Sequence, residues 1–371
     1  MTARFQPVRA LLRGACGPVF PGCGVAVLVR GEPVFVEAFG ALGVGPLAGH
    51  AASPGTLYDV ASLTKALVTA PLAIQLVAEG RLSTASAVAD WLPGVDRRFT
   101  VAQLLEHTSG LPAWRPYFLE LLQDGHPLLA PDQARTRSLA RLRREELEAA
   151  PGARELYSDL GFLLLGWVLE AAGGAPLDRL FAERLAAPLG LSARFGPLPR
   201  VDAAAPTEAY AGRPLARGVV HDDNAFALGG IAGHAGLFAT ALDAARLGAE
   251  LLAARRGDST MFDAGTTRAF VDAPRPPLPR TRIPGFDTPT PGASSAGSTF
   301  GRQAFGHLGF TGCSWWCDPA RELVVVLLSN RVHPTRRNEA IRALRPVFHD
   351  SVATCLQPDL PSPAKRERDG G

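Results

Sequence analysis

The sequence predicts an α/β fold in which an antiparallel sheet is flanked by helices and interrupted by a mainly helical insertion. Strand-like segments lie near both ends of the 371-residue chain, and helical patterns fill its middle. Segments far apart in sequence can pair in one antiparallel sheet, which leaves the helices between them as an insertion. The composition, 47% hydrophobic and 20% charged residues, is ordinary for a globular protein with a sizeable core.

The chain begins its sheet with a predicted hairpin. Two short apolar runs, 24–29 and 33–39, are separated by Arg-Gly-Glu, a turn signal between strands. A long apolar segment, 61–79, then predicts a helix that ends at Gly80, because glycine commonly terminates helices. Pro71 within this segment predicts a kink or break, since proline lacks a backbone N–H and clashes with the preceding turn.

The middle of the chain is helical. Thr100 and Gln103 form a Thr-x-x-Gln capping box, which predicts a helix start. Further helical patterns cover 133–149, 159–172 and 176–186. A strand-like run at 233–240 follows, and then a helix is predicted at 243–253, with Thr240 and Asp243 resembling its N-terminal cap.

The C-terminal part returns to strands. A loop rich in Pro, Gly and Ser spans 273–300 and is long enough to be functional. Strands are predicted at 304–310, 313–317 and 322–328, and a final amphipathic helix at 338–355. We therefore expect a sheet subdomain from 1–60 and 235–356, a helical subdomain from 61–234, and a disordered tail at 357–371, with a small-molecule site between the two layers.

Charge and cysteine usage exclude several classes of protein. The formal net charge is +3, which is too small to indicate electrostatic binding to nucleic acid or to a membrane surface. No apolar run approaches the 18 or so residues of a membrane span, and no signal peptide is evident, so we expect a cytoplasmic protein. The five cysteines fit free thiols better than a disulfide framework, and they do not form a metal-ligand set.

Lysine is unusually rare. Only two of the 38 basic residues are lysine, Lys65 and Lys365, and the others are arginine. Arginine supplies a fixed positive charge, whereas lysine can be tuned into a base by burial and by its neighbours. Lys65 is therefore a candidate for chemistry that arginine cannot supply.

Ser62 and Lys65 are the strongest candidates for catalysis. A spacing of three places both side chains on one face of the predicted helix, and the first turn leaves backbone N–H groups free for an oxyanion. In this apolar segment Lys65 should be partly buried, which would lower its pKa, and a serine activated by a neighbouring lysine is an established nucleophile. The alternative is an ordinary solvated helix start, because Ser-x-x-Lys also occurs by chance.

Two further motifs lie later in the chain. Tyr157-Ser158-Asp159 precedes a buried helix, where the tyrosine can face a cleft and Ser158 or Asp159 can serve as helix cap. Gly306-His307-Leu308-Gly309 lies on a strand; glycines there indicate close approach of another backbone or a ligand, and His307 can be cationic near neutral pH. An isolated histidine is otherwise structural.

Taken in order, these three motifs resemble those of penicillin-recognising serine enzymes, and more closely the class C β-lactamase-related serine hydrolases. The resemblance covers residues 20–355 and is supported by the segments 104–112, 233–238 and 330–334. It implies a β-lactamase/transpeptidase-like fold and a reaction without metal or organic cofactor.

The resemblance also implies roles for individual residues. Ser62 would be the nucleophile, Lys65 its proton partner and Tyr157 the general base that relays the proton to the leaving group. The backbone N–H groups of Ser62 and Phe310 would form the oxyanion hole. Asp159, His307 and Gly309 would contact the substrate. His107 and His234 are expected to make structural hydrogen bonds, and residues 222–224 either line the cleft or form a turn.

Two positions depart from the family pattern. The second motif most often ends in Asn, and a carboxylate at Asp159 would instead favour the ammonium form of Lys65 and raise its pKa. The third motif commonly begins with Lys, so His307 weakens the fixed positive charge that meets a substrate carboxylate. Both departures argue against β-lactamase activity more than against hydrolysis.

The sequence thus predicts a hydrolase that forms an acyl-enzyme on a small ester, amide or muropeptide, of the esterase or peptidoglycan-fragment amidase type. Nucleic acid and membrane are not expected partners. Two alternatives remain open: a penicillin-binding sensor with little turnover, and a true class C β-lactamase.

Overall fold

The computed structural model describes residues 4–95, 99–123, 126–208, 216–277 and 279–356. Its α-helices are α1 (Gln6–Ala15), α2 (Ala70–Ala78), α3 (Val101–Leu105), α4 (Pro131–Leu142), α5 (Asp159–Gly173), α6 (Leu177–Phe181), α7 (Asp223–Ala227), α8 (Ala241–Arg256), α9 (Ala264–Val271) and α10 (Ile341–Leu356). The tail predicted at 357–371 lies outside the described residues.

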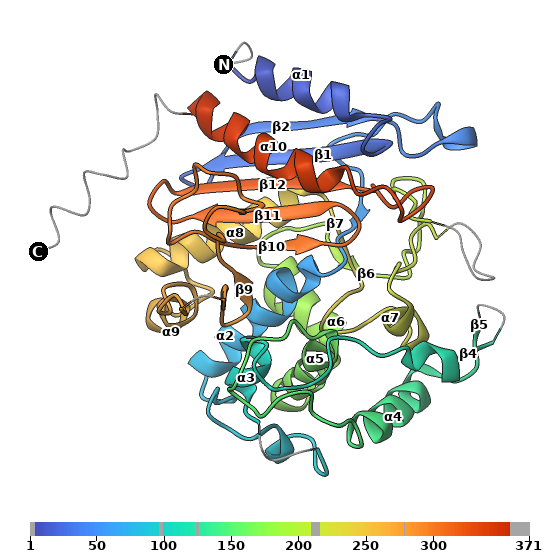
Figure 1. Ribbon diagram of the computed structural model, residues 1–371, viewed down its shortest axis with the longest axis vertical. Helices are drawn as coiled ribbons and strands as arrows, with labels where there is room; N and C mark the ends of the chain where they lie inside the picture. Colours follow the sequence, from blue (N-terminus) through green and yellow to red (C-terminus); the bar gives the residue numbers. More distant parts are fainter. Residues whose placement is uncertain (1–3, 96–98, 124–125, 209–215, 278, 357–371) are drawn as a thin grey trace, which may run out of the picture.

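The large sheet is assembled from both ends of the chain, as the sequence predicts (Figure 1). Its strand order is β2-β1-β12-β11-β10-β9-β8, and the neighbouring strands pair antiparallel. The strands are β1 (Gly22–Val29), β2 (Glu32–Gly40), β8 (Arg282–Ile283), β9 (Phe286–Asp287), β10 (Phe305–Gly309), β11 (Cys313–Asp318) and β12 (Leu323–Ser329). The first and last long strands are direct neighbours, with Val25 opposite Leu327.

Side chains alternate between two cores on the faces of this sheet. Val325 and Leu327 of β12 belong to the core shared with α1 and α10, whereas Val324 and Val326 belong to the core shared with α8. This alternation follows from the two-residue period of a strand. Because both faces are covered by helices, the central strands β1, β11 and β12 are almost entirely buried and mostly apolar. The seven residues of β12 are all buried.

The helical insertion packs on the core of the α8 face. Helices α2 to α6 lie together below the sheet in Figure 1, and residues of α2 and α5 belong to the same core cluster as α8 and β12. Two shorter sheets complete the fold, β3-β7-β6 (Tyr58–Asp59, Leu237–Ala239, Arg194–Phe195) and β4-β5 (Leu122–Gln123, His126–Pro127). The subdomain boundaries at residues 60 and 235 stay a prediction.

Several elements differ from the sequence prediction. The helix predicted at 133–149 ends at Leu142. At Pro71 the helix is irregular but not broken: a π-helical turn, Lys65–Thr69, runs directly into α2, and the junction residues Thr69 and Ala70 are helical. The π-helical turn changes the hydrogen-bond pattern just before Pro71, which lacks a backbone N–H. The segment 273–300 is not only loop, because its hairpin β8-β9 extends the large sheet.

Other elements were not predicted at all. Helices α1, α7 and α9 have no counterpart in the sequence analysis, and they are short segments, of 10, 5 and 8 residues. The capping boxes at Thr100 and Thr240 are confirmed. All five cysteines carry free thiols.

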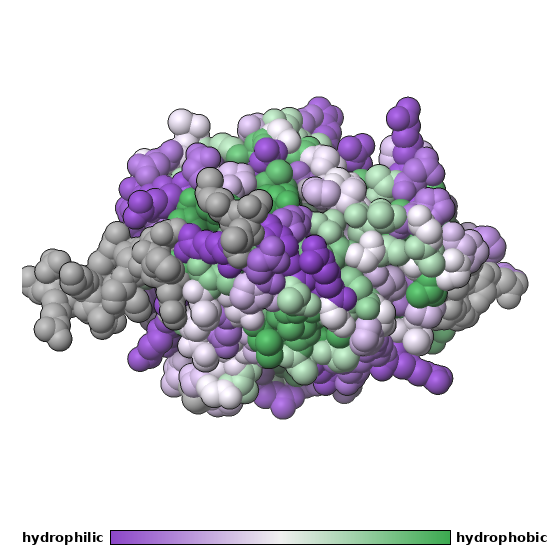
Figure 2. Space-filling view, turned by 90° about the horizontal axis from the view of Figure 1, so that it is seen from above, coloured by the Kyte–Doolittle hydropathy of each residue, from purple (hydrophilic) through white to green (hydrophobic). Residues whose placement is uncertain are grey.

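The surface over α1 and α10 is mixed in polarity. Seen from above, hydrophilic and hydrophobic residues lie side by side (Figure 2). Among the described residues no single helix has the length and apolar character needed to cross a membrane. The helix pair Asp159–Gly173 and Leu177–Ala186, bent by 70° at the break between them, is long and apolar enough only when both helices are taken together.

Candidate active site

Ser62 lies in a tight turn between β3 and the helix that follows. The turn is fixed by Asp59, whose buried carboxylate accepts the N–H of Ala61 at 2.8 Å and that of His221 at 2.6 Å. Ala61 adopts a left-handed conformation, with φ of 49°, which is strained for a residue with a side chain. The half-buried Ser62 is thereby held at the mouth of the helix.

Lys65 faces Ser62, as the spacing of three predicts. Its Nζ lies 3.2 Å from Ser62 Oγ, 2.7 Å from Asp159 Oδ1 and 3.4 Å from the carbonyl oxygen of His234. The side chain of Lys65 is fully buried, more than the partial burial expected from the sequence. All three donors of the ammonium group therefore have an acceptor.

The pKa of Lys65 is raised, not lowered. Burial by itself lowers the pKa of this amine. The negative charge of Asp159 and the contacts with Tyr157 raise the pKa by more than burial lowers it, so that the net shift is upward. The expectation of a lowered pKa from burial alone is wrong, because it left out the carboxylate. The expectation drawn from the Asp159 departure is confirmed.

Tyr157 is held among rings and cations. Its ring centroid lies 4.5 Å from that of His107, and the cations of Lys65 and Arg282 lie 4.8 and 5.0 Å from it. Burial raises the pKa of the Tyr157 hydroxyl, Lys65 opposes this shift, Asp159 adds to it, and the net direction is upward. Both Lys65 and Tyr157 are consequently protonated at neutral pH.

Ser158 and His107 anchor the segment that carries Tyr157. Ser158 caps α5 by accepting the N–H of Gly161 at 3.0 Å, and its hydroxyl donates to the carbonyl of Pro112 at 2.6 Å. Its own N–H donates to Nδ1 of His107 at 2.9 Å. Burial lowers the pKa of His107 well below its ordinary value, which leaves Nδ1 free to accept. The structural hydrogen bond expected for His107 is confirmed.

His234 and Asp222 also agree with the expectations. His234 Nε2 lies 3.0 Å from Asp222 Oδ1, a structural contact beneath the site. Asp222 caps α7 by accepting the N–H of Ala225 at 2.8 Å and also lines the cleft. Of the two interpretations of residues 222–224, the cleft holds for Asp222 and Asp223, whereas Asn224 does not line it; in place of a simple turn, the segment begins helix α7.

Strand β10 passes very close to the segment that carries Ser62. A Cβ on Gly309 would lie 2.4 Å from the carbonyl oxygen of Val60, so that only glycine permits this approach. The next residue is Phe310, and neither its N–H nor that of Ser62 donates a hydrogen bond to another described residue. Both N–H groups lie at the cleft, where they can receive an oxyanion.

His307 is buried and neutral. Its Nδ1 lies 2.8 Å from the carbonyl oxygen of Leu308, and its Nε2 has no partner among the described residues. Burial lowers the pKa of His307 below its ordinary value. The expectation that His307 supplies a cation near neutral pH is therefore wrong, because the sequence does not show how deeply β10 is buried.

The cleft has other cations instead: Arg331, Arg336, Arg342 and Arg345 line it, and so does Arg282 on β8. The guanidinium of Arg282 contacts Glu155 at 2.5 Å and Asp287 at 2.7 Å, and it lies over the ring of Tyr157. The sequence analysis missed Arg282, since it treated the segment as loop. Arginine is common throughout this chain, and residue type alone could not single out one of 36.

One cleft of about 500 Å³ collects nearly all the predicted site residues. Ser62, Tyr157, Asp159, His307, Gly309 and Phe310 line it, and Lys65 lies buried beneath Ser62. No group of three His, Cys, Asp or Glu side chains in the described part of the chain could hold a metal ion.

The chain matches known proteins over most of its length. The family model described as Beta-lactamase matches residues 8–347. A protein of Escherichia coli K12 named "Putative D-alanyl-D-alanine carboxypeptidase" is 33% identical over 315 residues, 76% of this chain and 70% of the relative. A protein of the same name from Escherichia coli O157:H7 is 31% identical, over 85% of this chain and 79% of its own.

Two solved structures share the fold. EstCE1, a hydrolase with promiscuous acyltransferase activity, superposes with a TM-score of 0.73 at 22% identity, covering 93% of this chain and 99% of its own. A penicillin-binding protein homologue from Caulobacter crescentus also gives a TM-score of 0.73 at 22% identity, covering 95% and 98%. These likenesses confirm the β-lactamase/transpeptidase-like fold expected from the sequence.

Proposed function

Because the chain belongs to the beta-lactamase family, we propose that it is a serine hydrolase that forms an acyl-enzyme through Ser62 on an ester or amide substrate. The observation that carries this proposal is the 3.2 Å contact between Lys65 Nζ and Ser62 Oγ at the floor of a cleft lined by Tyr157. A nucleophile within hydrogen-bond reach of a titratable partner, itself oriented by a third group, is the arrangement that covalent catalysis requires.

In the acylation step Ser62 Oγ attacks the substrate carbonyl, and the N–H groups of Ser62 and Phe310 bind the resulting oxyanion. The proton of Ser62 passes to the Lys65–Tyr157 pair, and Tyr157 returns it to the departing alcohol or amine. Water then attacks the acyl carbonyl and gives a proton to the same pair, and the proton returns to Ser62 as the acid is released.

The charge of the pair sets when acylation can occur. Lys65 and Tyr157 both have pKa values above their ordinary range, so neither is a free base at neutral pH. Acylation therefore depends on the fraction of molecules in which the pair has lost one proton, and its rate should rise as the pH rises toward the pKa of the pair.

The relatives suggest the substrate class. The relatives carry the name "Putative D-alanyl-D-alanine carboxypeptidase", and the cleft of about 500 Å³ is of a size that takes small ligands. We propose a small ester or a short peptide amide, such as a peptidoglycan fragment, as substrate.

A penicillin-binding sensor with little turnover is the second candidate. The observation that favours it is the ion pair between Lys65 and Asp159 at 2.7 Å, which keeps the amine protonated. In this alternative, a reactive acyl donor such as a β-lactam would still acylate Ser62, and the acyl-enzyme would persist because the protonated pair is a poor base for the attacking water.

The test is intact-mass spectrometry after exposure to a fluorophosphonate, with turnover of 4-nitrophenyl butyrate measured in parallel. We expect one adduct, located at Ser62, together with hydrolysis of the ester, and neither in Ser62→Ala. An adduct at another residue, or ester turnover that survives Ser62→Ala, would contradict the proposal.

A second exposure, to benzylpenicillin, separates the alternatives. A lasting adduct at Ser62 without ester turnover identifies a sensor. Rapid release of hydrolysed penicillin identifies a β-lactamase. Ester turnover with slow or absent penicillin hydrolysis supports the esterase or peptidase activity.

A further inference from the structure

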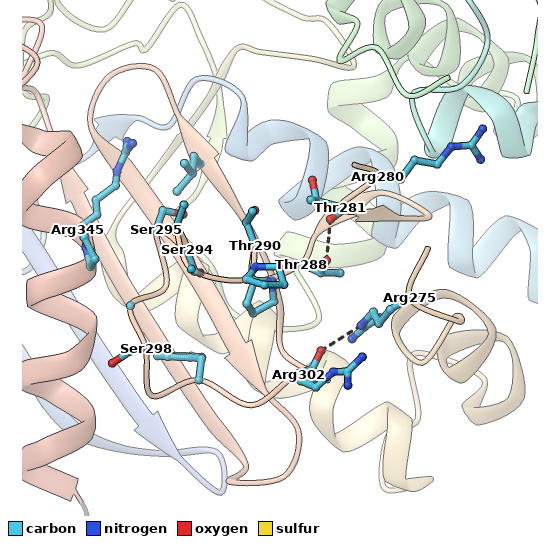
Figure 3. Close-up of a pocket in the computed structure, with 18 of the residues that line it drawn as sticks. Arg275, Arg280, Thr281, Thr288, Thr290, Ser294, Ser295, Ser298, Arg302 and Arg345 are labelled. Carbon is cyan, nitrogen blue, oxygen red and sulfur yellow. Dashed lines mark hydrogen bonds between the residues drawn. The ribbon is translucent and has the colours of Figure 1, made fainter. Parts of the chain in front are cut away.

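A second cavity adjoins the catalytic cleft. It has a volume of about 1290 Å³ and lies between the segment 275–302 and helix α10. Leu308, Arg342 and Arg345 line both this cavity and the catalytic cleft, so the two adjoin at these residues. Figure 3 shows Arg345 extending from α10 on one side, with Arg275 and Arg302 across the loop that carries Ser294 and Thr290. We call this cavity the arginine chamber.

Positive charge dominates the chamber. Five arginines line it, namely Arg275, Arg280, Arg302, Arg342 and Arg345. Asp350 is its only acidic lining residue within the described ranges. The carboxylate of Asp350 already accepts hydrogen bonds from the N–H and hydroxyl groups of Ser298 and Thr299, at 2.8 to 3.1 Å. The Asp350 carboxylate thus holds the loop at Ser298 and Thr299, and its single negative charge faces the positive charges of five arginines.

Arg345 is the most informative of these residues. It is buried, with 7% of its surface exposed, and its guanidinium donates to the carbonyl oxygens of Gly309 and Cys313, each at 2.8 Å. Its Nε has no partner, and no carboxylate pairs with it among the described residues. Burial lowers the pKa of Arg345 to about 10. A buried charge without a counter-ion is costly, and an anion beside it would offset that cost.

Three other arginines of the chamber also lack a carboxylate partner in the described part of the chain. Arg275 donates to backbone carbonyls, that of Gln303 at 2.7 Å and that of Arg302 at 3.2 Å. Arg280 donates to the carbonyl of Gly152, and Arg302 is exposed. Only Arg342 has an ion pair, with the exposed Glu339 at 3.0 Å. The charges of Asp272 and Glu106 act on Arg275 and Arg280 without forming an ion pair, so the positive charge least offset by side chains of the described residues is that of Arg345 and Arg302.

From these residues we infer that the arginine chamber binds an anionic part of the substrate, one that carries at least two negative charges, such as a phosphate monoester or a dicarboxylate. Planar guanidinium groups suit such oxyanions because they donate paired hydrogen bonds, and Thr290 and Ser295 add hydroxyl groups to the lining. This inference rests on the proposed function, since it describes how a substrate of Ser62 is selected.

Direct binding tests the chamber independently of catalysis. Inorganic pyrophosphate and tricarballylate, titrated calorimetrically into the full-length protein at low salt, represent the phosphate and carboxylate sources. We expect at least one to bind, and Arg302→Glu to weaken that binding about tenfold or more, the effect of losing one charge-assisted hydrogen bond. Arg200→Glu is the matched control, because Arg200 is exposed and lines neither cavity. Its binding should equal that of the wild type.

Turnover then tests whether the bound anion belongs to the substrate. The probes are 4-nitrophenyl butyrate, its 4-phosphono and 4,4-dicarboxy derivatives, and a butyrate ester of a phosphonophenol, which place the charges on either side of the scissile bond. We expect Arg302→Glu to raise the KM of at least one dianionic ester, relative to that of the neutral ester, about tenfold, and Arg200→Glu to leave this ratio unchanged. Absence of anion binding, or equal effects of the two variants, overturns the inference. Failure of every ester to react while the anions still bind would overturn the proposed function and leave the chamber as an anion site.

Discussion

The pairing of Lys65 with Asp159 determines the charge of the candidate site. Lys65 is the only lysine within the described residues, and it is fully buried. Burial alone would favour a neutral amine, but Asp159 at 2.7 Å reverses this tendency. The folded-state pKa of Lys65 lies above its ordinary value, so the ion pair stabilises the protein at neutral pH and is lost only as the pH rises through that raised pKa.

Asp159→Asn should therefore lower the pKa of Lys65, because burial, the largest influence on this amine, would no longer be outweighed. We expect the rising limb of the pH profile of kcat/KM to move to lower pH by about one unit or more, the usual effect of one adjacent charge. The measurement is ester turnover between pH 5 and 10. The control is Asp202→Asn, which removes an exposed carboxylate outside both cavities. An unchanged pH profile in Asp159→Asn would refute the idea that Asp159 sets the pKa of Lys65.

At the scale of the element, the N-terminus of α5 connects stability to the site. Ser158 caps the helix, while its neighbours Tyr157 and Asp159 both line the cleft. The cap is itself tied to Pro112 and His107 through two hydrogen bonds, at 2.6 and 2.9 Å. One residue thus holds the two neighbours that line the cleft, while Ser158 itself does not line it.

Ser158→Ala should cost about 1 kcal/mol of stability, the usual value for a lost N-cap, and should also lower kcat/KM about tenfold through displacement of Tyr157. Urea unfolding and ester turnover measure the two effects. Thr100→Ala removes the cap of α3, which lies outside the cleft, and serves as the control. It should lose comparable stability and keep its kcat/KM. Equal activity in both variants would disprove the positioning role.

At the scale of the whole molecule, a buried ion network connects distant parts of the chain. Glu208 lies 2.8 Å from His221 Nε2 and accepts the N–H of Arg336 at 2.8 Å. Burial would raise the pKa of Glu208, but these hydrogen bonds and the Arg336 charge lower it to about 2. A lowered pKa contributes stability above the unfolded-state value, and that contribution disappears between about pH 4.5 and 2.

Glu208→Gln should destabilise the protein at pH 7 and flatten the loss of stability between about pH 4.5 and 2, because the variant has no carboxylate to protonate. Denaturant unfolding across this range provides the measurement. Glu339→Gln removes one partner of an exposed pair with Arg342, a type of contact that contributes little, and should follow the wild type. An acid transition that is the same in Glu208→Gln would contradict the prediction.

The sequence alone predicted much of this protein, because its strongest signals are local or depend on residue type. The hairpin β1-β2, the three strands β10 to β12 and the capping boxes follow from short patterns. The scarcity of lysine and its spacing from Ser62 identified a pair that is in contact in the structure. The three motifs, taken in order, were enough to predict the β-lactamase/transpeptidase-like fold.

Only the tertiary structure decided the charges and the neighbours of the site. The family resemblance predicted that Asp159 would raise the pKa of Lys65, but only the structure shows that the two side chains, 94 positions apart, are in contact and that this effect exceeds that of burial. His307 is neutral because β10 is buried. Arg282 and the unpaired Arg345 reach the cleft from a sheet-edge hairpin and from the last helix. A pKa or an ion pair depends on what long-range packing brings within a few ångströms, and a linear pattern carries no record of that distance.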